Sequence, residues 1–236
     1  MEQNNHNNLT EIEKVNANTF SAPITIKQYN EVGLAKYEEY LIKKFFKGKR
    51  VLDIGCGCGR TTMPLSQMGF EVIGIDLVPE MIAVAQNKFL HIDFRIMNAC
   101  NLEFPDEHFD NVLFSFNGID NIYPNKKRLI ALKEIYRVLK PGGTFLFTSH
   151  NACCLPYNRY LMGIFVHNLI SLRIFTGYRL ETLSYGQIIQ HYVNPLLQKR
   201  CLKKIGFHYV KIFSRNFSDF LDTILLDPFP AYVAIK

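Results

Sequence analysis

A short apolar segment followed by three alternating glycines restricts the fold of this chain more than any other feature of its sequence. Residues 50–59 read Arg-Val-Leu-Asp-Ile-Gly-Cys-Gly-Cys-Gly. The apolar part is typical of a strand buried on both faces of a parallel sheet. Glycines at alternate positions permit positive φ angles and let a ligand approach the backbone without an intervening Cβ. A strand ending in such a loop predicts a nucleotide-like ligand at the carboxyl edge of an open α/β sheet.

The rest of the chain alternates between short apolar segments and longer amphipathic ones. Besides 50–54, strands are expected at 71–76, 92–97, 111–116, 144–149, 207–213 and 232–235. Helices are expected at 29–46, 61–68, 125–139 and 194–205, with a further one that begins at Pro79. Strands alternating with helices predict an α/β fold, with a mostly parallel sheet, right-handed crossovers and helices on both faces.

Two regions depart from this alternation. Residues 1–28 begin with an Asn-rich polar stretch, which predicts a flexible tail before a single domain at 29–236. Residues 150–192 are aromatic and apolar without a clean period, and we expect them to form a helical insertion after the fifth strand. At the carboxyl edge of the sheet, such an insertion would act as a substrate lid.

Composition limits the location and the chemistry. The chain has 236 residues, 48% of them hydrophobic and 20% charged. No apolar run approaches the ~18 residues needed to span a bilayer, and residues 1–8 lack a signal-peptide pattern, so a cytoplasmic location is expected. The six cysteines show neither paired C-x-x-C spacing nor a nearby histidine pattern, so no metal site is expected.

The charge is divided unevenly along the chain. Residues 1–118 contain 11 basic and 15 acidic side chains, a net of −4, whereas residues 119–236 contain 16 and 6, a net of +10. A basic half is compatible with an acidic substrate, with nucleic acid or with an anionic membrane surface, and equally with a solvated face that binds nothing.

The residues around the glycines narrow the choice of ligand. A dinucleotide fingerprint would read G-x-G-x-x-G, but Arg60 stands where the third glycine belongs, and neither a phosphate-loop motif nor a G-x-S-x-G motif occurs. Asp76 lies 21 positions after Gly55, close to the offset at which a carboxylate reaches ribose hydroxyls. Asp53 places a second acid beside the loop, which suits a cationic ligand. A ribose without a phosphate, next to a positive centre, describes S-adenosylmethionine.

Four motifs together resemble those of the class I S-adenosylmethionine-dependent methyltransferases. They are Val51–Gly59, Gly74–Asp76 with Pro79–Met81, Asn98–Asp106 with Phe109-Asp110, and Leu139–Gly143. They occur in the family's order and cover roughly residues 30–150. The resemblance implies a Rossmann-like three-layer sandwich with a seven-stranded sheet, and S-adenosyl-L-methionine as the cofactor.

The resemblance also implies roles for individual residues. Gly55, Cys56 and Gly57 would form the loop around the amino-acid part of the cofactor, with Asp53 near its ammonium group. Asp76 would bind the ribose hydroxyls. The expected adenine neighbours are Leu77, Asn98 and Ala99, and the site is completed by Phe114 and by an aromatic residue, Tyr29 or Tyr37, that closes over the cofactor. Asn98 departs from the family, which commonly has aspartate there, and a neutral amide is a weaker partner for the adenine amino group.

The acceptor side is less well defined. The segment after the fourth strand lacks both the Asn-Pro-Pro-aromatic signature of amino-directed methyltransferases and the Pro-Cys nucleophile of cytosine C5 enzymes. Asn117, Asp120 and Asn151 are expected to line the substrate edge. His150 is the best candidate for a general base, since the pKa of histidine is naturally near neutrality.

Three hypotheses for the function remain open. The first is methyl transfer to a small-molecule acceptor by in-line displacement, for which the cofactor supplies the electrophile and the protein the alignment. The second keeps the cofactor but makes RNA, such as a tRNA base, the acceptor. The third is a non-catalytic S-adenosylmethionine-binding subunit. A dehydrogenase is a more distant alternative.

Overall fold

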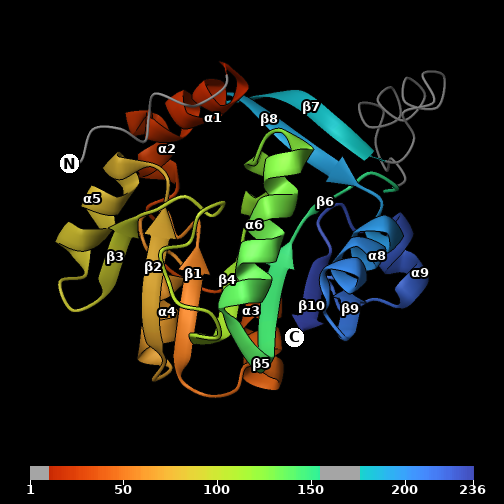
Figure 1. The fold of residues 1–236 in the computed structure, drawn as a ribbon. Helices are drawn as coiled ribbons and strands as arrows, with labels where there is room; N and C mark the ends of the chain where they lie inside the picture. The colour runs from red at the N-terminus through yellow and green to blue at the C-terminus, as the bar shows by residue number, and fades with distance from the viewer. Residues whose placement is uncertain (1–10, 155–175) are drawn as a thin grey trace.

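The centre of the molecule is a seven-stranded sheet with the strand order β3-β2-β1-β4-β5-β10-β9 (Figure 1). The computed structural model describes residues 11–154 and 176–236. β3, β2, β1, β4 and β5 run parallel, and β10 pairs antiparallel with both β5 and β9. The strands are β1 (Arg50–Ile54), β2 (Glu71–Asp76), β3 (Asp93–Ile96), β4 (Phe109–Phe114), β5 (Leu139–Thr148), β9 (Tyr209–Phe213) and β10 (Ala231–Ile235).

Helices cover both faces of this sheet, as the sequence predicted. The helices among the described residues are α1 (Glu11–Ser21), α2 (Pro23–Gln28), α3 (Lys36–Phe45), α4 (Thr62–Gln67), α5 (Pro79–Lys88), α6 (Asn125–Val138), α8 (Pro195–Ile205) and α9 (Phe220–Leu225), with a 3₁₀ turn η2 (Gly118–Asn121). Along β1, Val51 packs with α3 and α4, whereas Leu52 and Ile54 pack with α6 and α8. Side chains of a strand point alternately to its two faces, so β1 is apolar on both because both are covered.

The described part of the expected helical insertion is β-structure instead. β6 (His150–Asn151), β8 (Gly186–Val193) and β7 (Thr176–Leu183) form a three-stranded sheet, in which β7 and β8 make an antiparallel hairpin. Polar and apolar side chains mix along both strands, which hid their period in the sequence. Cross-strand backbone pairing holds the hairpin and does not depend on such a period. The remainder of the insertion lies outside the described residues.

The expectation of a flexible tail over residues 1–28 is wrong for the part that the structure describes. Residues 11–28 form α1 and α2; α1 lies at the top of the view in Figure 1 beside β8, and α2 follows below it. Thr25 and Asn16 are buried there, and both hydrogen-bond to backbone carbonyl groups. A helix fixed by polar side chains shows little apolar periodicity, which is why its sequence resembles a tail.

Smaller differences concern the ends of elements. The helix expected from residue 29 begins only at Lys36, and α9 was not predicted at all. The expected fourth strand ends two residues early, which places Ser115 and Phe116 in the loop beyond the strand. Among the described helices, none has the length and apolar character required to cross a membrane.

Candidate active site

The loop after β1 has the backbone shape that its glycines predicted. Gly55 and Gly57 have φ angles of 64° and 54°, in the left-handed region that favours glycine. A Cβ on Gly55 would lie 2.9 Å from the ring of Phe114. The backbone N–H of Cys56 donates to the carbonyl oxygen of Ile75 at 3.0 Å, which fixes the loop to β2. The loop therefore presents bare backbone at the carboxyl ends of the parallel strands.

Asp76 ends β2 directly beside this loop. One carboxylate oxygen accepts from the Gly57 N–H and the other from the Val78 N–H, both at 2.9 Å. Burial raises the pKa of Asp76, and the backbone donors of Val78, Gly57 and Leu77 oppose that rise. Each oxygen keeps lone-pair capacity for a further donor. The carboxylate is thus oriented to accept from two neighbouring hydroxyl groups.

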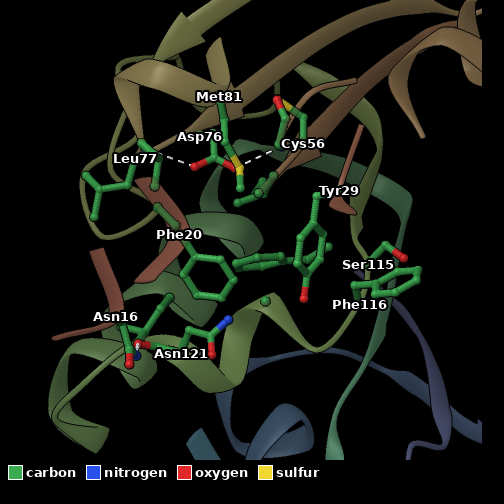
Figure 2. A pocket seen from close by; sticks show the side chains of 18 of the residues that line it. Asn16, Phe20, Tyr29, Cys56, Asp76, Leu77, Met81, Ser115, Phe116 and Asn121 are labelled. Atoms are coloured by element: carbon green, nitrogen blue, oxygen red, sulfur yellow. Dashed lines mark hydrogen bonds between the residues drawn. The ribbon is translucent and has the colours of Figure 1, made fainter. Parts of the chain in front are cut away.

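A pocket joins these parts. Figure 2 shows Asp76, Leu77, Cys56 and Tyr29 around one cavity. Nine of the ten predicted cofactor-binding residues line it: Gly55, Cys56, Gly57, Asp76, Leu77, Asn98, Ala99, Phe114 and Tyr29.

The wall on the expected adenine side is apolar except for Asn98. Leu77, Met97 and Ala99 line the pocket there. The Oδ1 of Asn98 accepts from the N–H of Cys100 at 2.9 Å, so one of its lone pairs is already used within the loop. The Asn98 amide therefore offers a ligand one acceptor lone pair and its Nδ2 donor group.

Asp53 is the predicted cofactor-binding residue that does not line the pocket. It is buried beneath the loop, where its Oδ2 accepts from the hydroxyls of Thr61 and Thr62, each at 2.7 Å. Burial raises the pKa of Asp53 to about 6 against the opposing effect of the two hydroxyls and of Arg60. Its Oδ1 has no hydrogen-bond partner within the described structure. Asp53 thus supports the loop from behind.

Arg60 holds one wall of the pocket together. In the sequence it was noted only because it stands where a dinucleotide motif would have its third glycine. Its guanidinium group pairs with Glu38, with nitrogen–oxygen distances of 2.7 and 3.0 Å, and also donates to the Ser115 hydroxyl at 2.8 Å. The same group donates to the carbonyl oxygen of Gly33 and lies 4.1 Å from the ring centroid of Phe116. One buried ion pair therefore joins α3, the start of α4 and the end of β4.

The outer end of the pocket is built from elements that sequence reasoning did not assign to the site. Asn16 and Phe20 come from α1, Phe116 and Asn121 from the segment after β4, and Gln190 from β8. Figure 2 shows Phe20 and Tyr29 across the cavity from Asp76, with the Asn121 side chain below Phe20 in the view. No local signal in the sequence pointed to Asn16 or Gln190.

The residues predicted for the acceptor side do not line this pocket. Asp120 is fully buried and accepts from the Ser149 hydroxyl, the His150 backbone N–H and the His150 ring Nδ1. Asn151 donates to carbonyl oxygens of the segment after β9, and the Asn117 backbone N–H donates to the Thr148 hydroxyl. These hydrogen bonds join η2 to the end of β5 and to β6, and join β6 to the segment around α9.

His150, the predicted general base, also lies outside the lining of this pocket. The residue is 4% exposed, and its ring packs against Tyr192 and Phe229. Within the described segments, no three metal-ligating side chains come together either.

The pocket fits S-adenosylmethionine in its chemistry. The glycine backbone leaves room for the amino-acid part, the two-oxygen carboxylate of Asp76 would face the ribose, and the apolar wall around Leu77 suits a purine. Because Gly55 has no Cβ, the loop backbone can lie close to the ring of Phe114. The Cβ of any other residue would clash with that ring.

Comparison with known proteins agrees with this geometry. A family model described as a methyltransferase domain matches residues 51–143. An uncharacterized protein of Methanocaldococcus jannaschii is 30% identical over 221 residues, which cover 88% of this chain and 84% of that protein. A demethylmenaquinone methyltransferase of Tropheryma whipplei is 39% identical over 133 residues. That match covers 53% of each chain, so this chain spans about half the length of that relative.

The fold is shared with solved structures of low sequence identity. Phosphoethanolamine N-methyltransferase 2 of Haemonchus contortus, solved with S-adenosyl-L-methionine, superposes with a TM-score of 0.69 at 18% identity, over 97% of this chain and 60% of that one. S-adenosyl-L-methionine is the methyl donor of the matched family. Together with the ordered motifs and the glycine loop beside Asp76, the family match shows that the chain carries a class I S-adenosylmethionine-dependent methyltransferase domain, and the solved structures show that it has the Rossmann-like fold.

Proposed function

We propose that the protein transfers a methyl group from S-adenosylmethionine to a small molecule bound in the outer end of the pocket. The observation that carries this proposal is that the pocket wall continues beyond the cofactor motifs. A second set of side chains follows, from α1, η2 and β8, in which Phe20, Asn121 and Gln190 face the same cavity. A molecule between these elements would lie next to the expected cofactor position.

The reaction requires alignment more than it requires protein chemistry. The cofactor supplies an electrophilic methyl group on sulfur, open to in-line attack by a lone pair of the acceptor. Gly57 and Asp76 hold the donor side, and Phe20 and Tyr29 cover the cavity and exclude water. Holding two reactants in line in this way supplies much of the rate enhancement of a displacement reaction. A general base is needed only where the acceptor begins protonated.

The relatives support an acceptor of small size. The proteins named demethylmenaquinone methyltransferases match about half of this chain, and their names describe a small-molecule acceptor. The residues at the outer end of the pocket come partly from α1 and β8, which lie outside the sequence motifs. We therefore propose only the class of the acceptor, a small molecule, and not its identity.

The test separates cofactor binding from transfer. Calorimetry with S-adenosylmethionine should show binding to the wild type, weakened about 100-fold by Asp76→Ala because the variant loses a charged acceptor for two hydroxyls. Asp93→Ala is the matched control, because Asp93 belongs to none of the four sequence motifs and does not line this pocket. Identical affinities for wild type and Asp76→Ala would refute the assigned cofactor site.

Transfer is then measured with a metabolite extract and isotope-labelled cofactor, with mass spectrometry of the products. Label in a small molecule supports the proposal. Label only in added tRNA, with binding that weakens steeply with salt, would favour the RNA alternative that the +10 half allows. An absence of turnover in both fractions would favour a non-catalytic cofactor-binding subunit.

A further inference from the structure

Both charged side chains in the described pocket wall already have partners. Asp76 accepts from two backbone N–H groups and faces the expected ribose position. The Arg60 guanidinium is shared among Glu38, Ser115 and the Gly33 carbonyl oxygen. The described wall at the outer end of the pocket therefore offers no unpaired charge to a ligand. An ion that enters this end would lose its hydration without gaining an opposite charge.

Two side-chain amides of the pocket wall, those of Asn121 and Gln190, are hydrogen-bonded to each other at this end. Gln190 Nε2 donates to Asn121 Oδ1 at 3.2 Å, which ties β8 to η2. That bond leaves the Asn121 Nδ2 donor and the Gln190 Oε1 acceptor, and neither has a partner among the described residues. Both residues line the pocket. The pair thus presents one donor and one acceptor beside each other.

The amide pair is held in place from behind. Asn16 Nδ2 donates to the Asn121 carbonyl oxygen at 3.2 Å and to the Ile189 carbonyl oxygen at 2.8 Å. Asn16 thereby joins the backbone of η2 to the backbone of β8, one residue before Gln190. Groups positioned by backbone contacts lose little freedom when a ligand binds, so their hydrogen bonds are selective.

Aromatic rings form the remaining walls. Phe20 and Tyr29 meet edge to face with ring centroids 6.1 Å apart, and Tyr29 meets Phe116 in the same way at 6.4 Å. The Tyr29 hydroxyl is 3.0 Å from the hydroxyl of Tyr185 in the β7–β8 turn, which fixes the ring from the other side. Fixed ring faces and edges favour a flat partner.

We propose, on the basis of the function proposed above, that Asn121 and Gln190 select an uncharged, flat acceptor. Its polar edge, a hydroxyl or an NH–C=O group, accepts from Asn121 Nδ2 and donates to Gln190 Oε1. Sites built to hydrogen-bond one polar group discriminate strongly against analogues that lack it, because the buried donor and acceptor are then left unpaired.

The test uses four probes that share a flat ring system, titrated into the full chain saturated with S-adenosylhomocysteine. They are 2-naphthol, naphthalene, the anion 2-naphthoate and the cation 2-naphthylmethylammonium. We expect 2-naphthol to bind about tenfold more tightly than naphthalene, since two hydrogen bonds are gained. The two ions should bind more weakly than 2-naphthol by about tenfold or more.

Variants assign this preference to the amide pair. Gln190→Leu and Asn121→Leu should each remove most of the advantage of 2-naphthol over naphthalene and leave the affinity for S-adenosylhomocysteine unchanged. Gln187→Leu is the matched control, because Gln187 lies on the same strand with an exposed side chain outside the pocket. Unchanged cofactor affinity in a variant also shows that it has folded.

Each outcome bears on the proposal. Binding of either ion as tight as that of 2-naphthol would overturn it, as would an undiminished preference for 2-naphthol in both variants, or no binding of any probe. These results leave the methyltransferase proposal intact, because that proposal fails separately if no labelled small-molecule product forms.

Discussion

The Asn16 side chain pairs with both polar backbone groups of Ile189. Its Oδ1 accepts from the Ile189 N–H at 2.7 Å, and its Nδ2 donates to the Ile189 carbonyl oxygen at 2.8 Å. A single side-chain amide thus attaches α1 to β8 in the way that a residue of a neighbouring strand would. Thr19 adds a third bond along the same edge, to the Gln187 carbonyl oxygen at 2.6 Å.

Replacement of Asn16 should release the helices that cover the pocket. Asn16→Ala removes hydrogen bonds worth about 1 kcal/mol each. We expect faster amide hydrogen exchange across residues 11–28 and little change in the exchange of β1. Asn18→Ala is the control, since Asn18 is exposed on the same helix. Equal protection of residues 11–28 in the two variants would show that the Asn16 bonds do not hold α1.

The Arg60–Glu38 pair should behave as one unit. The Glu38 side chain is 2% exposed, so Arg60→Met leaves a buried carboxylate without its partner and should lower the free energy of unfolding by about 3–5 kcal/mol. The double variant Arg60→Met, Glu38→Leu should recover part of this loss because no unpaired charge remains. Urea unfolding of the two single variants and the double variant measures the coupling. Additive losses would contradict a coupled pair.

Asp53 should make the stability of the protein depend on pH. Burial raises the pKa of Asp53 to about 6, above the value of about 4 expected in the unfolded chain. Between these values the folded state binds a proton that the unfolded state does not, so the contribution of Asp53 is full below about pH 4 and is lost as the pH rises through about 6.

The comparison with Asp53→Asn isolates this effect. Relative to the variant, the free energy of unfolding of the wild type should fall by roughly 3 kcal/mol between about pH 4 and about pH 7. Urea unfolding at several pH values measures it. A difference that is independent of pH would show that Asp53 is not protonated preferentially in the folded protein.

Asn98→Asp should strengthen cofactor binding. One carboxylate oxygen would keep the bond from the Cys100 N–H, and the other would offer a charged acceptor to the adenine amino group, a bond roughly twice as strong as a neutral one. We expect a several-fold lower dissociation constant for S-adenosylmethionine by calorimetry. Asn98→Ala should raise that constant. An affinity for Asn98→Asp below that of the wild type would place the adenine edge elsewhere.

The inner end of the pocket could be predicted because its residues come from local patterns. Gly55 and Gly57 follow one short apolar strand and Asp76 ends the next, and carboxyl ends of neighbouring parallel strands meet at one edge of a sheet. The period of the strands, the positions of the glycines and the order of the chain are therefore enough to place these three residues at the same edge of the sheet. Asp53 fits the same motif, but residues of a strand alternate in direction, and its side chain turns beneath the loop.

The same rule did not find residues of the pocket wall on the acceptor side. His150 and Asp120 follow strands at the same edge, yet their side chains meet each other behind η2 at 2.9 Å and do not line the cavity. A position at a strand end says which edge a residue occupies. The direction of the side chain depends on the turn that follows, and η2 was not predicted.

The sequence by itself determined the fold family, the methyl donor and the inner wall of the pocket, since all three depend on contacts between consecutive strands and loops. Only the tertiary structure decided what covers that pocket. Asn16 meets Ile189 across 173 positions of sequence, and it does so through hydrogen bonds between a side chain and a backbone. Such bonds need no apolar period and leave no spacing pattern in either segment, so only the folded chain shows that α1 and β8 form one wall of the pocket.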